Sequence, residues 1–554
     1  MGAEFHGSFI LVLHSHLPYV LRHGAFEEEM LLEAAAECYI PLLRTFERLA
    51  TEGVSPKVTV GLSPCLVDQL ADPYFQRRFR EYCLEKAAWA VRDRGEFEHD
   101  NAHLAWLARR WEQFYLDTCR TFTETYRDNL PGAFRALQDA GHIELITCAA
   151  THAYLPVLYS DATVRAQLRA AVAAHTRHFG RAPRGLWLPE CGFRPAYPWR
   201  PPFTHLAAEP PRDRTGLDDL IAEQGLRFFV IDGHQLEKSW PPDLAKTPFS
   251  TYATVHSNGF PPPTVFARDV GLSLQVWRHQ VGYPGDGVYL EFHKRHGQGR
   301  HRYWKVTDNR LGLDGKDLYY PDDAERFRIP EHAGHYKFLI AQALRRYFLD
   351  TGRPGAAVVA FDTELFGHWW FEGPQFLYHV IKWMHQDPEL AAVTCSEHLE
   401  RFPAVNRIGV AESSWGNHFD HSTWVNPEVE WVWERIYHAE RELGYLAREF
   451  KNGRLDPPLS RILNQAAREA FLLMASDWQF MITNWSTRDH AEHRAHEHHA
   501  DFERLARMAW DYGAGRAVAQ DDWTFLADAE QRDRLLEDLD ISFFAEDHVE
   551  GGTR

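Results

Sequence analysis

Two acidic residues, Glu190 and Asp362, each follow a short apolar run and lie close to tryptophan in the sequence. The apolar runs have the length of strands, so each carboxylate is expected at the mouth of a buried strand. Placing a carboxylate beside indole costs free energy unless the group has a chemical task. Two carboxylates cleave a glycosidic bond when one protonates the leaving oxygen and the other attacks the anomeric carbon. The pair therefore predicts chemistry on sugars.

The proton donor of such a pair needs a raised pKa, and burial among indole rings raises the pKa of a carboxyl group. Either Asp362 or Glu364 could be this donor, and we favour Asp362 because it lies nearer the strand end. The structural alternatives are that Asp362 caps a helix or pairs with a base, and that Glu190 pairs with Arg194. Pro189 restricts the backbone just before Glu190, which favours a catalytic position.

Histidine and tryptophan residues mark further candidate sites. His14 and His16 follow the first strand-like run, where they could bind a metal ion or sugar hydroxyls, or only form structural hydrogen bonds. Trp415, Trp424 and Asp477 could provide stacking surfaces or interface packing. Charged residues interleave with a group of five histidines, so we expect a solvated helix face there and no metal site: His490, His493, His496, His498 and His499.

The composition limits the possible partners and location. The chain has 554 residues with a net charge of -18, 14% aromatic residues and 19 tryptophans. This length predicts more than one domain, and the negative charge argues against nucleic acid and anionic membranes as partners. The seven cysteines form no C-x-x-C pair, which predicts reduced thiols. The apolar run 9–13 is too short for a signal sequence or a membrane span, so we expect a cytoplasmic protein.

Short apolar runs alternate with helical patterns in the first part of the chain, at 9–13, 58–62, 143–147, 185–188, 228–231 and 356–361. This alternation predicts an α/β fold with parallel strands whose polar ends form the active rim. We expect an incomplete or distorted (β/α) barrel over residues 1–402, with a helical insertion at about 74–140 and a loop over the cleft at about 239–269. Helical patterns at 429–450, 459–474 and 490–514 predict a C-terminal α-helical domain over residues 403–554.

Several motifs resemble those of glycoside hydrolase family 57, in matching order along nearly the whole chain. The main ones are segments 14–19, 187–191 and 361–370, and further similarity lies at 275–277, 282–285, 414–416 and 476–478. The resemblance implies a distorted (β/α)7 barrel with a helical insertion and a C-terminal helical domain, and a retaining mechanism without metal or another cofactor. Glu190 would be the nucleophile and Asp362 the general acid/base. The implied substrate-binding residues are Arg268, Gly285, Trp415, Asp477, His14, His16, His152, Trp277 and Trp424.

The subgroup that the chain resembles contains α-1,4-glucan branching enzymes and AmyC-type amylases. We expect a branching enzyme, which cleaves an α-1,4 bond of a glucan and transfers the chain to a 6-hydroxyl. The alternative is an amylase-type hydrolase, because segment 23–27 lacks the tryptophan of branching members and their loop tyrosine has only Tyr252 or Trp240 as candidates. Two further alternatives are a metal-dependent hydrolase that uses His14 and His16, and an inactive glucan-binding protein. The sequence leaves the oligomeric state open.

Overall fold

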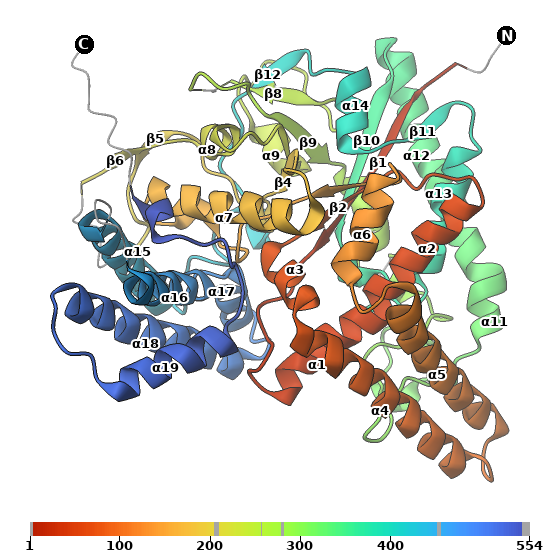
Figure 1. Ribbon diagram of the computed structural model, residues 1–554. Coiled ribbons are helices and arrows are strands. Elements are labelled where there is room, and N and C mark those ends of the chain that lie inside the picture. Colours follow the sequence, from red (N-terminus) through yellow and green to blue (C-terminus); the bar gives the residue numbers. More distant parts are fainter. Residues whose placement is uncertain (1–3, 204–209, 256–257, 279–281, 451–455, 546–554) are drawn as a thin grey trace.

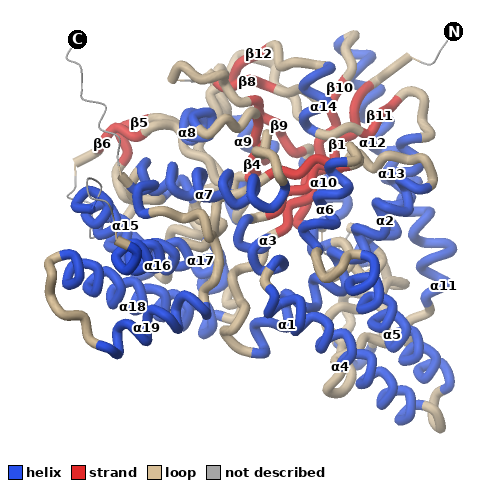
Figure 2. The backbone as a smooth tube through the Cα atoms, viewed as in Figure 1, coloured by secondary structure: helices blue, strands red, loops and turns tan. Residues whose placement is uncertain are grey.

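Seven parallel strands form the centre of the described part of the molecule. A computed structural model describes residues 4–203, 210–255, 258–278, 282–450 and 456–545 (Figure 1). In order around the barrel, the strands are β1 (Gly7–Ser15), β2 (Val58–Leu62), β3 (Ile143–Ile146), β4 (Gly185–Trp187), β7 (Phe228–Asp232), β9 (Thr264–Arg268) and β10 (Gly355–Asp362). Figure 2 shows these strands in red, surrounded by helices.

The barrel is distorted because two of its seams are held by few hydrogen bonds. Continuous ladders join β10, β1, β2 and β3 on one side and β4, β7 and β9 on the other. A parallel bridge between Thr147 and Leu186 closes the first seam. At the second seam the Asp269 amide donates to the Val358 carbonyl at 2.8 Å. The predicted distorted (β/α)7 barrel is confirmed.

Both faces of the central strands are apolar because helices cover the outside and side chains fill the inside. Along β1, Ile10 and Val12 point into the barrel, where they pack with Trp187 and Phe266. The neighbouring Leu11 and Leu13 belong to the larger core beneath the helices. Since the interior is packed, functional groups lie at the rim formed by the carboxyl ends of the strands.

Helices follow the strands in the order that the alternation predicts. Around the barrel they are α1 (Ala25–Ala34), α2 (Ile40–Thr51), α3 (Pro64–Ala71), α6 (Leu130–Asp139), α7 (Asp161–Phe179), α8 (Leu217–Glu223), α9 (Gly233–Lys238), α10 (Val270–Trp277), α11 (Pro321–Asp323), α12 (Ile329–Thr351), α13 (Gly373–His385) and α14 (Cys395–Arg401). The paired helices α4 (Pro73–Phe97) and α5 (Ala102–Arg120) project from the molecule at the lower right of Figure 1. Asp72 and Asn101 cap the starts of α4 and α5 with their side chains, which fixes where each helix begins.

Segment 239–269 contains two strands, β8 (Tyr252–Thr254) and β9. Strand β8 pairs with β9 and with β12 (Asn406–Ile408), so it extends the sheet. Tyr252 is buried and its hydroxyl accepts a hydrogen bond from the Thr247 amide at 2.8 Å, so its interpretation as a loop-tip tyrosine is wrong. Trp240 has 64% of its surface exposed. The remaining strands are β5 (Tyr197–Trp199), β6 (Arg212–Arg214) and β11 (Leu390–Ala392).

The C-terminal part is helical, with α15 (Glu430–Phe450), α16 (Pro457–Leu473), α17 (Ser476–Thr483), α18 (Arg488–Gly513) and α19 (Gln520–Arg532). His493 and His496 on α18 are exposed, as a solvated face requires. The same expectation is wrong for His498, which is fully buried and hydrogen-bonded to Glu469 at 2.8 Å. No helix in the described ranges is long and apolar enough to span a membrane.

Candidate active site

Candidate functional side chains from distant parts of the sequence meet at the carboxyl rim of the barrel. His14 lies on β1, His152 follows β3, Glu190 follows β4, Arg268 ends β9 and Asp362 ends β10. Parallel strands bring these ends together, as the sequence pattern predicts. The C-terminal part adds Trp415, Ser476 and Asp477 to the same rim.

Glu190 is held in a fixed orientation. Its backbone has φ 59° and ψ 21°, a left-handed conformation that a residue with a β-carbon rarely adopts. The Trp415 indole donates to its Oε2 at 2.8 Å, and the Ser476 hydroxyl donates to its Oε1 at 3.0 Å. The Trp415 amide also donates to the Glu190 carbonyl at 3.0 Å. These contacts aim one carboxylate into the rim, which is what a nucleophile requires.

Asp362 differs from Glu190, because no side chain in the described ranges donates a hydrogen bond to its carboxyl group. It is the last residue of β10 and pairs in register with His14 on β1. Glu364, the alternative proton donor, is buried and accepts a hydrogen bond from the Tyr39 hydroxyl at 2.5 Å. The geometry therefore favours Asp362 as the carboxyl group that is free to exchange a proton with a ligand.

Burial raises the pKa of both rim carboxyl groups. Burial, together with the nearby charge of Asp362, raises the pKa of Glu190 to about 8, while the hydrogen bond from Trp415 opposes the rise. The pKa of Asp362 rises to about 6 through burial, and the positive charge of Arg268 opposes this. Because the two groups interact, these values belong to the pair, which holds one proton between about pH 6 and pH 8.

A row of histidines forms the floor beside the carboxylates. The Nε2 atoms of His14 and His152 are 3.0 Å apart, and His152 Nδ1 is 2.8 Å from the Ser476 hydroxyl. Burial lowers the pKa of His14 and of His152 well below the ordinary value, so both rings are neutral near pH 7. His16 Nε2 contacts Asp477 Oδ2 at 3.0 Å. Nitrogen and oxygen atoms of His16, His152 and Asp477 are close enough to bind one cation together. A metal-dependent hydrolase would use these three residues.

Arg268 is positioned by a residue that the sequence argument missed. Its Nε donates to Asp232 Oδ2 at 3.0 Å, and its guanidinium carbon lies 5.3 Å from the centre of the Trp415 ring. Asp232 is fully buried at the end of β7. The position of Asp232 at the end of a predicted strand is the sequence feature that could have identified it. Ser476 directly precedes Asp477 and was also not predicted as a site residue.

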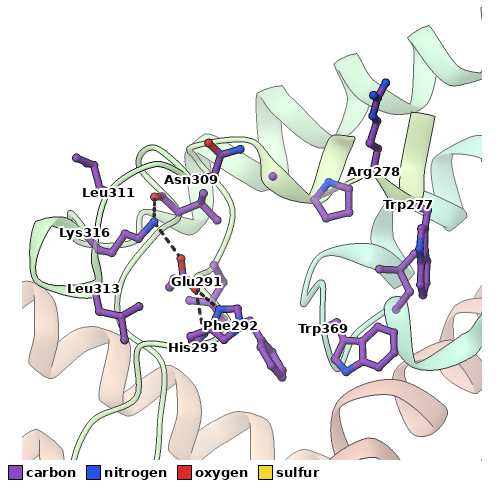
Figure 3. Close-up of a pocket in the computed structure, with 15 residues that line it drawn as sticks. Trp277, Arg278, Glu291, Phe292, His293, Asn309, Leu311, Leu313, Lys316 and Trp369 are labelled. Atoms are coloured by element: carbon purple, nitrogen blue, oxygen red, sulfur yellow. Dashed lines mark hydrogen bonds and ion pairs between the residues drawn. The ribbon is translucent and has the colours of Figure 1, made fainter. Parts of the chain in front are cut away.

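Trp277 and Gly285 line a pocket of about 510 Å³ together with Leu365 and Trp369, which follow Asp362 in the chain (Figure 3). The Trp277 and Trp369 rings are 5.8 Å apart at an angle of 63°. Trp424 is not part of these walls. It is buried and stacks on Tyr154 at 4.6 Å, so the structure does not support its predicted contact with substrate; it packs beneath Gly416 instead.

Comparisons with known proteins agree with this fold. Residues 10–411 match the profile of glycosyl hydrolase family 57, and residues 435–544 match that of the C-terminal domain of 1,4-α-glucan branching enzymes. The chain is 37% identical to a 1,4-α-glucan branching enzyme of Thermococcus kodakarensis over 95% of this chain and 77% of that protein. The protein therefore belongs to glycoside hydrolase family 57.

Two solved structures show how far the likeness extends. The branching enzyme of this family from Pyrococcus horikoshii has a TM-score of 0.90 and 36% identity, covering 98% of this chain and 97% of that chain. The α-amylase AmyC from Thermotoga maritima has a TM-score of 0.83 and 27% identity, covering 98% of this chain and 99% of that chain. The chain is thus more similar to the branching enzyme than to the amylase.

Proposed function

We propose that this protein is a retaining 1,4-α-glucan branching enzyme in which Glu190 is the nucleophile and Asp362 is the general acid/base. The observation that carries the proposal is the contrast between the two carboxyl groups. Trp415 and Ser476 fix both oxygens of Glu190, whereas no described side chain holds the carboxyl group of Asp362. A fixed carboxylate suits attack on carbon, and an unbonded one suits proton transfer in both directions.

In the first step Glu190 attacks C1 of an α-1,4-linked glucose while Asp362 gives its proton to the departing oxygen. The C1–O4 bond breaks, and a glucosyl ester forms on Glu190. In the second step the 6-hydroxyl of an acceptor chain attacks the same C1. Its proton passes to Asp362, and the ester electron pair returns to Glu190. Both steps invert C1, so the new α-1,6 bond keeps the α configuration.

The cleft residues support these steps without changing charge. His14 and His152 are neutral, so they can lie against the sugar without adding charge, and the Asp477 carboxylate can accept hydrogen bonds from sugar hydroxyls. We propose that Arg268, Gly285, Trp277, His16 and Trp415 complete the substrate contacts. We also propose a cytoplasmic location, which the free state of all seven cysteines supports.

An amylase-type hydrolase is the second candidate. Phe26, in the segment that lacks the tryptophan of branching members, is 66% exposed at the start of α1. In an enzyme whose cleft stays open, water reaches the glucosyl ester in place of an acceptor chain.

Proton NMR of amylose after reaction, with reducing ends counted in the same sample, decides between the two candidates. New α-1,6 anomeric signal with few new reducing ends is the expected result. Reducing ends without α-1,6 signal would make the protein an amylase, and neither signal would make it a binding protein. We expect full activity in excess chelator; loss of activity would point to a cation held by His16, His152 and Asp477.

A further inference from the structure

Four large apolar side chains are exposed on the walls of the pocket beside Asp362. Trp277 and Trp369 are 40% and 41% exposed, and Leu311 and Leu313 are 45% and 46% exposed. In Figure 3 the two tryptophans lie on one side of the view and the two leucines on the other. Exposed apolar side chains that gather in one concave site mark a surface that a ligand covers.

The two leucines are held in place by the loop that carries them. Tyr303–Lys305 and Asp317–Tyr319 form a short stem, in which the Lys305 amide donates to Asp317 and the Tyr319 amide donates to Tyr303, both at 2.9 Å. The tip between them is braced by Lys316, whose ammonium group donates to the carbonyls of Val306 and Asp308 at 2.8 Å. Lys316 also pairs with Glu291 at 3.3 Å. These hydrogen bonds and this ion pair therefore hold Leu311 and Leu313 in fixed positions on the pocket wall.

The position of the pocket relative to Asp362 identifies the part of the ligand that it receives. Leu365 and Trp369 of the pocket come from the turn that directly follows Asp362. A general acid lies on the side of the departing oxygen, and the acceptor later enters from that same side because the second step reverses the proton transfer of the first. The pocket lining is thus continuous in the chain with Asp362, as a site on the acceptor side of the cleft would be.

We infer that this pocket binds the acceptor α-glucan chain and that Leu311 and Leu313 determine how well an acceptor competes with water. The inference rests on the proposed function. The C–H faces of the acceptor sugar rings would cover Leu311, Leu313 and the two tryptophans, while Glu291 and Asn309 offer polar groups to hydroxyls. A bound acceptor presents its 6-hydroxyl to C1 of the glucosyl ester and excludes water from it.

The test is the double variant Leu311→Ala/Leu313→Ala, measured on amylose as the ratio of new α-1,6 bonds to new reducing ends. This ratio reports only how the glucosyl ester divides between acceptor and water, so it does not depend on how fast the ester forms. We expect the ratio to fall about tenfold, which corresponds to about 1.4 kcal/mol of lost acceptor binding. The matched control is Leu349→Ala, because Leu349 is a 72% exposed leucine on α12 outside the pocket, and its ratio should equal that of the parent.

The outcomes separate this inference from the proposed function. A parent enzyme that makes no α-1,6 bonds would remove the proposed function itself. If the parent branches and the double variant keeps the parent ratio, the acceptor role of the loop is wrong while the branching assignment stands. A lowered ratio in the double variant that Leu349→Ala does not share supports the inference. An equal drop in the control variant would overturn it.

Discussion

At the scale of single residues, the two rim carboxyl groups predict how activity depends on pH. In the proposed mechanism the reactive state has one proton on the pair, with Glu190 ionised and Asp362 protonated. The two pKa values place this shared proton mainly on Glu190 in the free enzyme, so the reactive state is the less populated of the two one-proton forms. Above about pH 8 the raised pKa of Glu190 is passed and the pair loses its last proton, so no acid remains. Below about pH 6 the raised pKa of Asp362 is passed and both groups are protonated, so no nucleophile remains.

We therefore expect a bell-shaped profile of kcat/KM with limbs near pH 6 and pH 8. The measurement is initial branching rate on amylose across pH, with thermal stability followed at each pH as a control. Trp415→Phe removes a hydrogen bond that favours ionised Glu190, so its alkaline limb should move to higher pH. A parent profile that stays flat from pH 5 to pH 9 would contradict the shared proton.

The same residues predict two different kinds of inactive variant. Glu190→Gln keeps the shape of the side chain but removes the nucleophile, so turnover should be abolished while glucan binding persists. Residual activity within about tenfold of the parent, or about 1.4 kcal/mol of barrier, would sink the role of Glu190. Binding of maltooligosaccharide by calorimetry is the control for folding.

Asp362→Asn should also be nearly inactive, but azide should partly restore it on substrates with good leaving groups. Azide can attack the glucosyl ester without a general base, so the product would be an α-glycosyl azide. Full activity of this variant would move the acid role to Glu364, although the hydrogen bond from Tyr39 to Glu364 argues against that.

At the scale of elements, the start of α17 joins the C-terminal helices to the barrel rim. Ser476 and Asp477 lie in the first turn of this helix and contact Glu190 and His16. Asp477→Asn should lower kcat/KM by about tenfold to a hundredfold, because it weakens a charge-assisted hydrogen bond that orients His16. The matched control is Asp489→Asn, an exposed residue in the first turn of α18, which should keep the parent kinetics. Equal kinetics in the two variants would show that the contact with His16 does not matter.

Much of the barrel was predictable from the sequence, because a strand buried on both faces is a continuous apolar run. The runs at 9–13 and 58–62 lie within β1 and β2, and both carboxylates lie at strand ends as expected. The loop that carries Leu311 has no such local signal. It is positioned by distant contacts, such as the Trp111 indole donating to the Arg302 carbonyl at 2.7 Å. The prediction that His498 lies on a solvated helix face is wrong for the same reason, since its burial depends on Glu469 of another helix.

At the scale of the whole molecule, a buried cluster of charged residues ties the segment after β1 to the C-terminal helices. His23 Nε2 lies 2.7 Å from Asp533 Oδ1, and the Arg532 Nε donates to Asp533 Oδ2 at 2.7 Å. Arg494 on α18 donates to the Tyr19 carbonyl at 3.0 Å. The cluster therefore joins the chain segment that follows His14 and His16 to the C-terminal helices, one of which carries Asp477.

Asp533 is the centre of this cluster, and its charge should stabilise the whole fold. Burial alone would raise the pKa of Asp533, but the hydrogen bond from His23 and the charge of Arg532 hold it well below the ordinary value. A lowered pKa means that the stabilisation is present above the unfolded value of about 4 and is lost as the pH falls below it. Asp533→Asn should therefore reduce the free energy of unfolding at pH 7 by about 3 to 5 kcal/mol, since it removes the buried negative charge that pairs with His23 and Arg532.

Thermal and denaturant unfolding of this variant, beside Asp528→Asn on the exposed face of α19, measures the effect. The control should unfold like the parent. The difference in the free energy of unfolding between Asp533→Asn and the parent should become smaller below about pH 4, because protonation of Asp533 then removes its stabilising charge in the parent. Branching activity should fall at a lower temperature in Asp533→Asn than in the control, because separation of the helices removes Asp477 and Ser476 from the rim. If Asp533→Asn is as stable as the control at pH 7, apolar packing alone joins the barrel to the C-terminal helices.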